Sequence, residues 1–276
     1  MIPADLFDYA FIPSWYEQLY ELSQLAEPES WRFREPEYEM KNTETPILER
    51  YINRIFKSQA IGYNYAAPEE ADSFFYIRNQ FSCFHTGLYT PSLKPIYMCF
   101  DRNSYEKRTK TWCFKGFADE NSTWLRYVQP LPQSLVSHLR GRMMYFDPNR
   151  EIRVNTEHIL EDEENVARLP ETIRTAWNLP LLLQTAVEMS RRKAQTDLNV
   201  VAVQMFHSQV QYILPIYMTR MDQPDLAMAL SVMDGYYLGH TCLTLEMAYQ
   251  NARLLARPSA GWLTALVEPE RSQDDA

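Results

Sequence analysis

Glutamine side chains interrupt two apolar, strand-like segments in the C-terminal half of the chain. Gln204 lies in the first segment, and Gln209 and Gln211 lie in the second. A buried amide must be hydrogen-bonded, so each glutamine either joins a network within a sheet or contacts a ligand. Amides flanked by aromatic rings can recognise the edge of a base, and Phe206, Tyr212 or Tyr217 could stack on the face of that base. Gln204 and Gln211 are therefore candidate ligand-binding residues.

Two arginines are candidates for contacts with phosphate. Arg142 belongs to a basic segment at 140–153, and Arg253 lies on the last helix that the sequence predicts. A guanidinium group suits bidentate hydrogen bonds to phosphate oxygens. Thr244 is expected to cap that last helix, whose N-terminus could also attract phosphate. The alternative for Arg253 is a structural network with Glu246 on the same helical face.

Two histidines are candidate acid–base residues. His85 precedes Thr86 and Gly87, and a glycine at that place lets the backbone approach a ligand. His158 shares a helical face with Glu161 and with Asp162. The structural alternatives are a His85 satisfied by the backbone of a hairpin end and acidic residues that complement a helix dipole. No serine nucleophile motif and no signature of paired carboxylates accompanies them.

Four cysteines favour buried thiols over a metal site. Cys83, Cys99 and Cys113 fall on three consecutive strand-like runs, and a Cys₃His site with His85 is geometrically conceivable. The ligand pairs lack the tight turn spacing of structural zinc sites, and no C-x-x-C is present. We therefore expect four reduced thiols, with Cys242 as the fourth, and neither a metal nor another cofactor.

Composition excludes several classes of function. Only 7 of the 276 residues are glycine, and their positions build neither G-x-G-x-x-G nor G-x-x-x-x-G-K-[ST]. The net charge of −9 disfavours nonspecific binding of duplex DNA, which requires the neutralisation of many phosphates. No apolar run reaches the length of a membrane span, and the N-terminus lacks the basic start of a signal peptide. We expect a cytoplasmic protein without a membrane partner.

The N-terminal part predicts two helices. Ser14 and Glu17 match a capping box at the start of the first helix, which Pro28 is expected to end. Thr45 and a proline at the next position begin the second helix. Its apolar residues recur at the spacing of a buried stripe, and Gly62 is expected to close it.

The middle and C-terminal parts alternate between strands and helices. Three aromatic-rich runs at 81–90, 95–102 and 111–119 predict an antiparallel meander, and 142–147 and 151–155 predict two further strands. Prolines open two helices at 169–177 and 179–195. Strand pairs follow at 200–207 with 209–218 and at 225–233 with 236–245, before a last helix at 244–258. This order favours an α+β class with antiparallel sheets flanked by N-terminal and C-terminal helices.

Several segments resemble the DUF3825 family in the same order along the chain. They are FHTGLYT, PIYMCF and WCFKGF in the meander, the segment at 145–171, VQMFHSQVQYILPIYM, and the closing GHTCLTLEMAYQNARLLARPSAGWL. The resemblance implies one domain at 14–265, with an extension at 1–13 and an acidic tail at 266–276. Two positions depart from the family pattern as we expect it: His85 stands in place of an asparagine, and Val203 to Phe206 in place of Pro-Gln-Tyr-Tyr.

The resemblance implies a nucleic-acid or nucleotide context, because family members are sometimes joined to RNA-binding modules. The leading hypothesis is therefore an accessory or regulatory domain that binds RNA or a nucleotide-like phosphate ligand. The acidic charge favours a nucleotide or a short single strand over long RNA. The second hypothesis is an enzyme that acts on RNA or nucleotides, with His85 or His158 as acid–base group and with Arg142 and Arg253 at the phosphate. The third is a protein-interaction domain that docks a partner through the aromatic meander or the acidic N-terminal helices.

Overall fold

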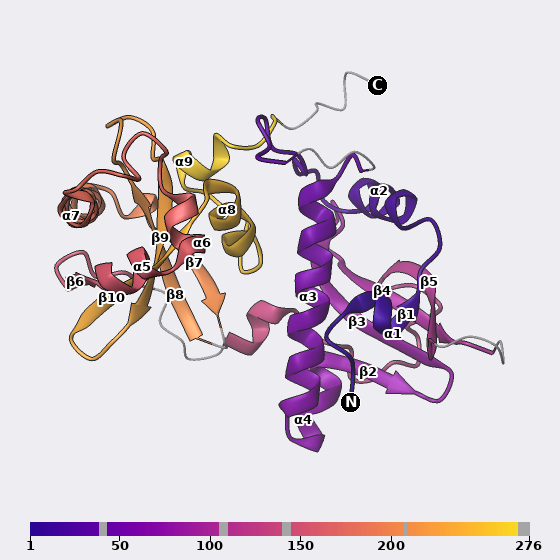
Figure 1. Ribbon diagram of the computed structural model, residues 1–276. Helices are drawn as coiled ribbons and strands as arrows, with labels where there is room; N and C mark the ends of the chain where they lie inside the picture. Colours follow the sequence, from indigo (N-terminus) through magenta and orange to yellow (C-terminus); the bar gives the residue numbers. More distant parts are fainter. Residues whose placement is uncertain (39–42, 105–109, 140–144, 207–208, 270–276) are drawn as a thin grey trace. The chain divides into compact units, whose positions relative to one another are not determined.

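The computed structural model describes residues 1–38, 43–104, 110–139, 145–206 and 209–269. The chain divides into two compact units, each with its own five-stranded sheet (Figure 1). Unit 1 comprises Met1–Arg32, Tyr38–Arg140 and Glu268–Ala276, and unit 2 comprises Phe33–Glu37 and Gly141–Val267. Helices and sheets together confirm the α+β class. The single domain at 14–265 stays a prediction.

Unit 1 consists of a sheet and the N-terminal helices. Its helices are α1 (Leu6–Tyr9), α2 (Trp15–Leu25), α3 (Pro46–Tyr65) and α4 (Pro68–Phe74), with a 3₁₀ turn, η1, at Leu135–Leu139. Its strands are β1 (Ala10–Phe11), β2 (Phe75–Arg78), β3 (Phe81–Tyr89), β4 (Pro95–Arg102) and β5 (Trp112–Asp119). The order is β1-β5-β4-β3-β2, and β1 pairs with β5 in parallel while the other pairs are antiparallel. The predicted meander is therefore confirmed as β3 to β5.

Strand alternation gives the sheet of unit 1 two buried faces. Phe84 and Phe100 lie on the face that packs against the apolar stripe of α3, where Phe56 meets Phe84 edge-on at 5.6 Å between ring centroids. The predicted extension at 1–13 contributes to this core, because Tyr9 stacks with Trp112 and is buried. The opposite face buries a smaller cluster, in which Tyr97 is the one aromatic member: Cys83, Tyr97, Cys99, Ala118, Leu125 and Val128.

The two predicted N-terminal helices are confirmed, but their ends differ from the expectation. Ser14 precedes α2 in a left-handed conformation with φ 50°, and its side chain makes no capping hydrogen bond. Gly62 does not close α3, which continues to Tyr65. A glycine occurs there because the ring of Phe74 occupies the place of a side chain: an added Cβ at position 62 would lie 2.2 Å from that ring.

Unit 2 consists of a second mixed sheet between helices. Its strands are β6 (Glu151–Val154), β7 (Ala202–Phe206), β8 (Gln209–Ile216), β9 (Leu226–Val232) and β10 (Tyr236–Leu243). Its helical elements are α5 (Thr156–Glu161), α6 (Glu163–Arg168), α7 (Leu179–Thr196), η2 (Leu198–Val200), α8 (Leu245–Arg253) and α9 (Gly261–Thr264). The order is β6-β10-β9-β8-β7, and only the β6–β10 pair is parallel. Both predicted C-terminal strand pairs are confirmed.

Two predictions within unit 2 are wrong in the described residues. The helix predicted at 169–177 is a series of turns, in which the Arg174 guanidinium donates to the carbonyls of Ala167 and Leu169. The strand predicted at 142–147 lies in part outside the described residues, and residues 145–147 form no strand. In place of hydrogen bonds to a neighbouring strand, the backbone there bonds to tyrosine hydroxyls. The hydroxyl of Tyr237 accepts from the backbone N–H of Asp147, and that of Tyr212 donates to the carbonyl of residue 145.

The two faces of this sheet differ in chemistry. On one face, alternate residues of the strands pack with α7 in an apolar core that includes Leu183, Leu214, Met228 and Leu230. On the other face, α8 packs against β7, β9 and β10 (Figure 1), and this face carries the glutamines that the sequence singled out. None of the described helices is long and apolar enough to cross a membrane.

We predict that Gly62→Ala destabilises the protein by about 1–3 kcal/mol, the usual cost of an overpacked site. The added methyl group must displace Phe74, which stacks on His138 at 3.7 Å between ring centroids. Gly261→Ala is the matched control, since nothing lies within 4 Å of an added Cβ there. Urea denaturation measures both variants, and equal stability of the two would contradict the packing argument.

A polar row on the sheet of unit 2

Register places polar side chains from three neighbouring strands side by side on the α8 face. Gln204 of β7 pairs with Gln211 of β8, which pairs in turn with Ser231 of β9. Leu238 of β10 follows opposite Ser231, and Arg153 of β6 follows opposite Leu238. The two glutamines and Ser231 therefore lie in line across the sheet, as cross-strand neighbours do.

These side chains form one continuous chain of hydrogen bonds. Gln204 Nε2 donates to Gln211 Oε1 at 2.7 Å, and Gln211 Nε2 donates to Ser231 Oγ at 2.8 Å. Ser231 Oγ lies 2.9 Å from His240 Nε2, and His240 Nδ1 lies 2.9 Å from Thr241 Oγ1. From the helix, Asn251 Nδ2 donates to Gln204 Oε1 at 2.7 Å. We call these residues the polar row: Gln204, Gln211, Ser231, His240, Thr241 and Asn251.

A β-bulge brings His240 into the polar row. The pairing of β9 with β10 shifts between Gly239 and Thr241, so His240 is an extra residue on its strand. Bulges of this kind re-aim side chains, and this one places the imidazole against Ser231 rather than in the regular alternation. His240 and Ser231 are both half-buried, so this end of the row is reached by solvent.

Both ring nitrogens of His240 have a hydroxyl partner. Ser231 Oγ accepts a hydrogen bond from Gln211 and can donate its own proton to His240 Nε2. In that tautomer, the proton of the neutral imidazole is on Nδ1 and points to Thr241. Burial, and secondly the nearby His158, lower the pKa of His240 and favour this neutral form.

The structure brings some of the candidate residues together and separates others. Gln204 and Gln211 are bonded to each other, and each exposes 5% of its surface or less. Arg253 lies on α8, two residues after Asn251, and is also buried. Arg142 lies outside the described residues. His158 is exposed on α5, with its ring centroid 6.5 Å from that of His240.

The predicted features of α8 are present locally. Thr244 caps the helix and accepts a hydrogen bond from the backbone N–H of Met247. Glu246, Tyr249 and Arg253 are all buried, and Glu246 Oε1 accepts from the backbone N–H of Glu37 at 2.7 Å. Tyr249 also meets Phe33 edge-on, so α8 anchors the segment at 33–37 to unit 2.

His85 belongs to unit 1 and has a different environment. It lies on β3 with 3% of its surface exposed, between the rings of Tyr89 and Tyr97. Its Nδ1 accepts the backbone N–H of Gly87 at 2.8 Å, as the hairpin-end alternative expected. Burial lowers the pKa of His85 to about 4, so its ring is neutral near pH 7.

Two of the three thiols of unit 1 are packed as a hydrophobic pair, and the third, Cys113, is half-buried. Cys83 and Cys99 lie opposite each other on β3 and β4, and both are fully buried. Burial raises the pKa of both thiols, so they are protonated near pH 7. The part of the chain that the structure describes contains no group of three or more histidine, cysteine or acidic residues arranged to hold a metal ion.

Four members of the polar row were not candidates from sequence: Ser231, His240, Thr241 and Asn251. Ser231 closes a run of apolar β9 residues, and the Asp234–Gly235 turn predicts the hairpin register that sets it opposite Leu238. That signal could have identified Ser231. The bulge that turns His240 toward Ser231 has no comparable signature in the sequence.

The comparisons with known proteins agree with the extent of the fold. A family described as a domain of unknown function, DUF3825, matches residues 22–262. The chain belongs to the DUF3825 family. The match to DUF3825 includes all strands from β2 to β10, and so every described residue of the polar row. No curated protein and no solved structure matches the chain.

We predict that His85 makes the protein sensitive to acid. Its pKa is about 4 in the folded chain and about 6.5 in an unfolded one, so the unfolded state binds more protons between these values. The stability that results is present above pH 6.5 and is lost as the pH falls toward 4, on the order of 3 kcal/mol in total.

Urea denaturation at pH 7.5 and at pH 5 measures this loss. His85→Asn, which retains a polar side chain but does not titrate, is expected to reduce the difference between the two pH values. His158→Asn is the control, since His158 is exposed on α5. An unchanged pH dependence in His85→Asn would show that other groups carry the acid sensitivity.

Proposed function

We propose that unit 2 binds a nucleotide or a short single-stranded RNA on the α8 face of its sheet, at the Ser231 end of the polar row. The observation that carries the proposal is the row itself, which presents a half-buried hydroxyl and imidazole in fixed orientations. Donors and acceptors held in place in this way suit the edge of a base. In this proposal Ser231 and His240 contact the ligand. Gln204 and Gln211 hold Ser231 in position through the hydrogen bonds of the polar row.

Aromatic side chains next to the polar row support this ligand class. Phe206 follows Gln204 by two residues and so shares its face, and 53% of its surface is exposed. Tyr236 precedes Leu238 by two residues, and the guanidinium of Arg153 lies over its ring at 4.1 Å from the centroid. Exposed rings and arginine planes on a sheet are surfaces on which bases stack.

Charge supports a small ligand. Arg153 is paired with Glu151 at 2.8 Å, so the cation at this face is largely compensated. With a net charge of −9, the protein has little attraction for a long phosphate backbone. Stacking and hydrogen bonds therefore have to provide most of the affinity, which favours single-stranded over duplex ligands.

We expect Phe206→Ala and Tyr236→Ala each to weaken binding of a labelled single-stranded octanucleotide. Loss of one base–aromatic stack costs about 1–3 kcal/mol, or roughly 5- to 150-fold in affinity. Fluorescence anisotropy with RNA and DNA single strands, duplexes and labelled nucleotides measures the effect. Trp177→Ala is the control, because Trp177 lies in the same unit and is 93% exposed. The proposal would be refuted if the protein bound none of these ligands.

A second candidate function, an enzyme acting on the bound RNA or nucleotide, is favoured by the Ser231–His240 hydrogen bond of 2.9 Å. A neutral imidazole that accepts the proton of a hydroxyl is the arrangement of a general base with its nucleophile. In this mechanism Ser231 Oγ attacks phosphorus while its proton passes to His240 Nε2. The bond from phosphorus to the leaving oxygen breaks, and His240 returns the proton to that oxygen. Water that gives a proton to His240 then attacks the phosphorus bonded to Ser231, the bond from phosphorus to Ser231 Oγ breaks, and His240 returns the proton to Ser231.

We expect His240→Gln to abolish turnover of labelled RNA or nucleotides, measured with and without divalent metal. Because the base must be unprotonated and its pKa is lowered from 6.5, turnover should be constant above pH 6.5 and fall only in more acidic solution. His85→Asn, on a different sheet, should leave turnover unchanged at pH 7.5. Thermal denaturation confirms that each variant is folded. Equal turnover in His240→Gln and the parent would exclude this mechanism.

A further inference from the structure

A second row of side chains crosses the α8 face beside the polar row and is more exposed. Phe206 of β7 pairs with Gln209 of β8, and each lies two residues away from a buried glutamine of the polar row on its own strand. Because strand residues alternate between the two faces, Phe206 and Gln209 lie on the same face as the polar row. Phe206 exposes 53% of its surface, and Gln209 is also exposed. This second row therefore begins on β7, at an edge of the sheet that the described strands form.

The row continues at the hairpin that joins β9 to β10. Met233 follows Ser231 by two residues, and its backbone N–H donates to the carbonyl of Tyr236 at 2.9 Å. Tyr236 precedes Leu238 by two residues, and Leu238 lies opposite Ser231, so Tyr236 is on the α8 face as well. Met233 exposes 38% of its surface, and Tyr236 is half-buried. We call these four residues the outer row: Phe206, Gln209, Met233 and Tyr236.

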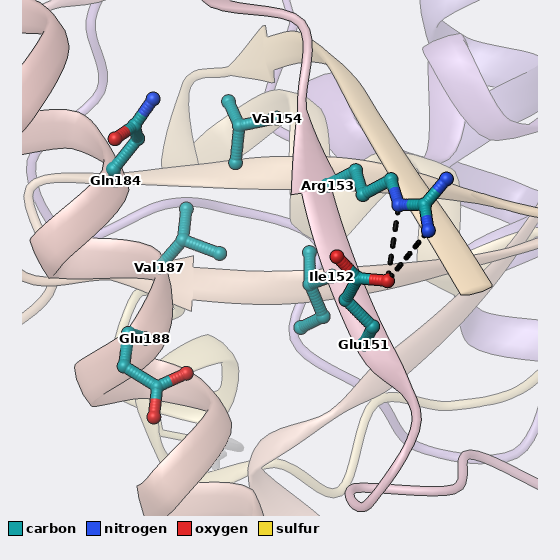
Figure 2. A pocket seen from close by; sticks show the side chains of 7 residues that line it. All are labelled: Glu151, Ile152, Arg153, Val154, Gln184, Val187 and Glu188. Atoms are coloured by element: carbon teal, nitrogen blue, oxygen red, sulfur yellow. Dashed lines mark hydrogen bonds and ion pairs between the residues drawn. The ribbon is translucent and has the colours of Figure 1, made fainter.

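Both ends of the outer row carry planar groups. At one end is the ring of Phe206. At the other end the guanidinium of Arg153 lies over the ring of Tyr236, 4.1 Å from its centroid, and 55% of the Arg153 side chain is exposed. Figure 2 shows this guanidinium directed away from α7 and joined to Glu151 by two hydrogen bonds, which hold its plane in place. One face of the guanidinium rests on Tyr236, and the other is available to a base.

Strand spacing sets the distance between these planar groups. The strands β7, β8, β9 and β10 are consecutive neighbours in the sheet. Neighbouring strands lie about 4.8 Å apart, so Phe206 on β7 and Tyr236 on β10 are separated by roughly 14 Å across the sheet. Neighbouring bases that stack on each other are only roughly 3.4 Å apart. One nucleotide, or two stacked nucleotides, therefore covers one end of the outer row and leaves the other end empty.

A single strand with its bases separated matches the whole outer row. Sheets that bind RNA hold two or three bases of one strand on rings and arginine planes. With planar groups on the first and fourth strands, one further nucleotide lies between the two stacked bases, where Gln209 and the half-buried Ser231 offer hydrogen bonds to its base edge. A protein partner would instead need a contiguous apolar patch, and the exposed amide of Gln209 separates Phe206 from Met233.

We propose that the ligand of unit 2 is a single strand of at least three nucleotides that crosses the outer row, with one base on Phe206 and the base two nucleotides away on the stacked pair of Arg153 and Tyr236. This inference rests on the proposed function. It narrows the ligand from a nucleotide or a short strand to an oligonucleotide, and it assigns the two planar groups to two different bases.

Fluorescence anisotropy with labelled oligoadenylates of one to six nucleotides tests the length of the ligand. The trinucleotide should bind about fivefold or more tightly than the dinucleotide, because it adds one base–aromatic stack. Equal affinity for the mononucleotide and the trinucleotide would overturn the inference but leave the proposed function in place. If no oligoadenylate and no other nucleotide or single strand bound, both would be overturned.

A double-mutant cycle between ligand and protein tests the crossing. Trinucleotides that lack the base at the first or at the third position are compared on the parent chain, on Phe206→Ala and on Tyr236→Ala. Removal of one terminal base should abolish the effect of Phe206→Ala, and removal of the other should abolish the effect of Tyr236→Ala. If both substitutions responded to the same terminal base, or to neither, the strand would not cross the row and the inference would be wrong.

Two further variants separate stacking from charge and from general effects on unit 2. Arg153→Lys retains the positive charge but removes the plane, so it should weaken binding and respond to the same terminal base as Tyr236→Ala. Unchanged binding by Arg153→Lys would contradict the assignment of a base to the guanidinium. Trp177→Ala is the control, because Trp177 is 93% exposed and does not belong to the outer row. Thermal denaturation checks that each variant is folded.

Discussion

Two glutamines on a packed sheet face impose the constraint from which the rest of unit 2 follows. Gln204 and Gln211 are almost completely buried, and an amide that loses water without a partner costs several kcal/mol. Each must therefore find donors and acceptors within the fold. Register sets the two amides opposite each other, Asn251 meets the carbonyl of one, and Ser231 receives the amide of the other. The polar row is thus a requirement of burial before it is a candidate site.

The hydrogen bond from Asn251 to Gln204 requires α8 to pack closely against the sheet. The strand that carries Ser231 has small residues on the same face, Ala227 and Ala229, and α8 contributes Ala248 and Ala252. Small side chains let a helix approach a sheet closely, so that a short side chain such as Asn251 reaches Gln204. A network with all members bonded is rigid, and rigidity passes along the row to the half-buried Ser231 and His240. The half-buried end of the row is therefore held in a fixed orientation.

The two sheets solve the same folding problem with different chemistry. In unit 1 the buried face is aromatic, with Phe56, Phe75, Phe84 and Phe100 in mutual contact, and its candidate residue His85 is enclosed by rings. In unit 2 one face is apolar, with both aliphatic and aromatic residues, and the other carries the polar row. Among the candidates described above, Ser231 and His240 of unit 2 are half-buried, whereas His85 of unit 1 is enclosed.

The sequence by itself determined the α+β class, the strands from β3 to β10, and the longer helices α2, α3, α7 and α8. These elements carry strong periodic patterns, and local physics is sufficient to place them. It also identified Gln204 and Gln211, because an amide in an apolar strand must be bonded to something. Sequence patterns did not predict that β1 pairs in parallel with β5 or that β6 pairs in parallel with β10. Both β1 and β6 are too short for a residue pattern that would indicate their partner strands.

Only the tertiary structure decided which residues meet. Gly62 was expected to end a helix, but the ring of Phe74 occupies the space of its missing side chain, and this packing partner belongs to another helix. The turns at 169–177 depend on Arg174 reaching carbonyls that a periodic pattern cannot anticipate. His240 joins Ser231 through a single extra residue in a strand. Propensity and periodicity depend on a few neighbouring residues, whereas strand register, bulges and packing depend on contacts between distant segments of the chain. The site is defined by these long-range contacts.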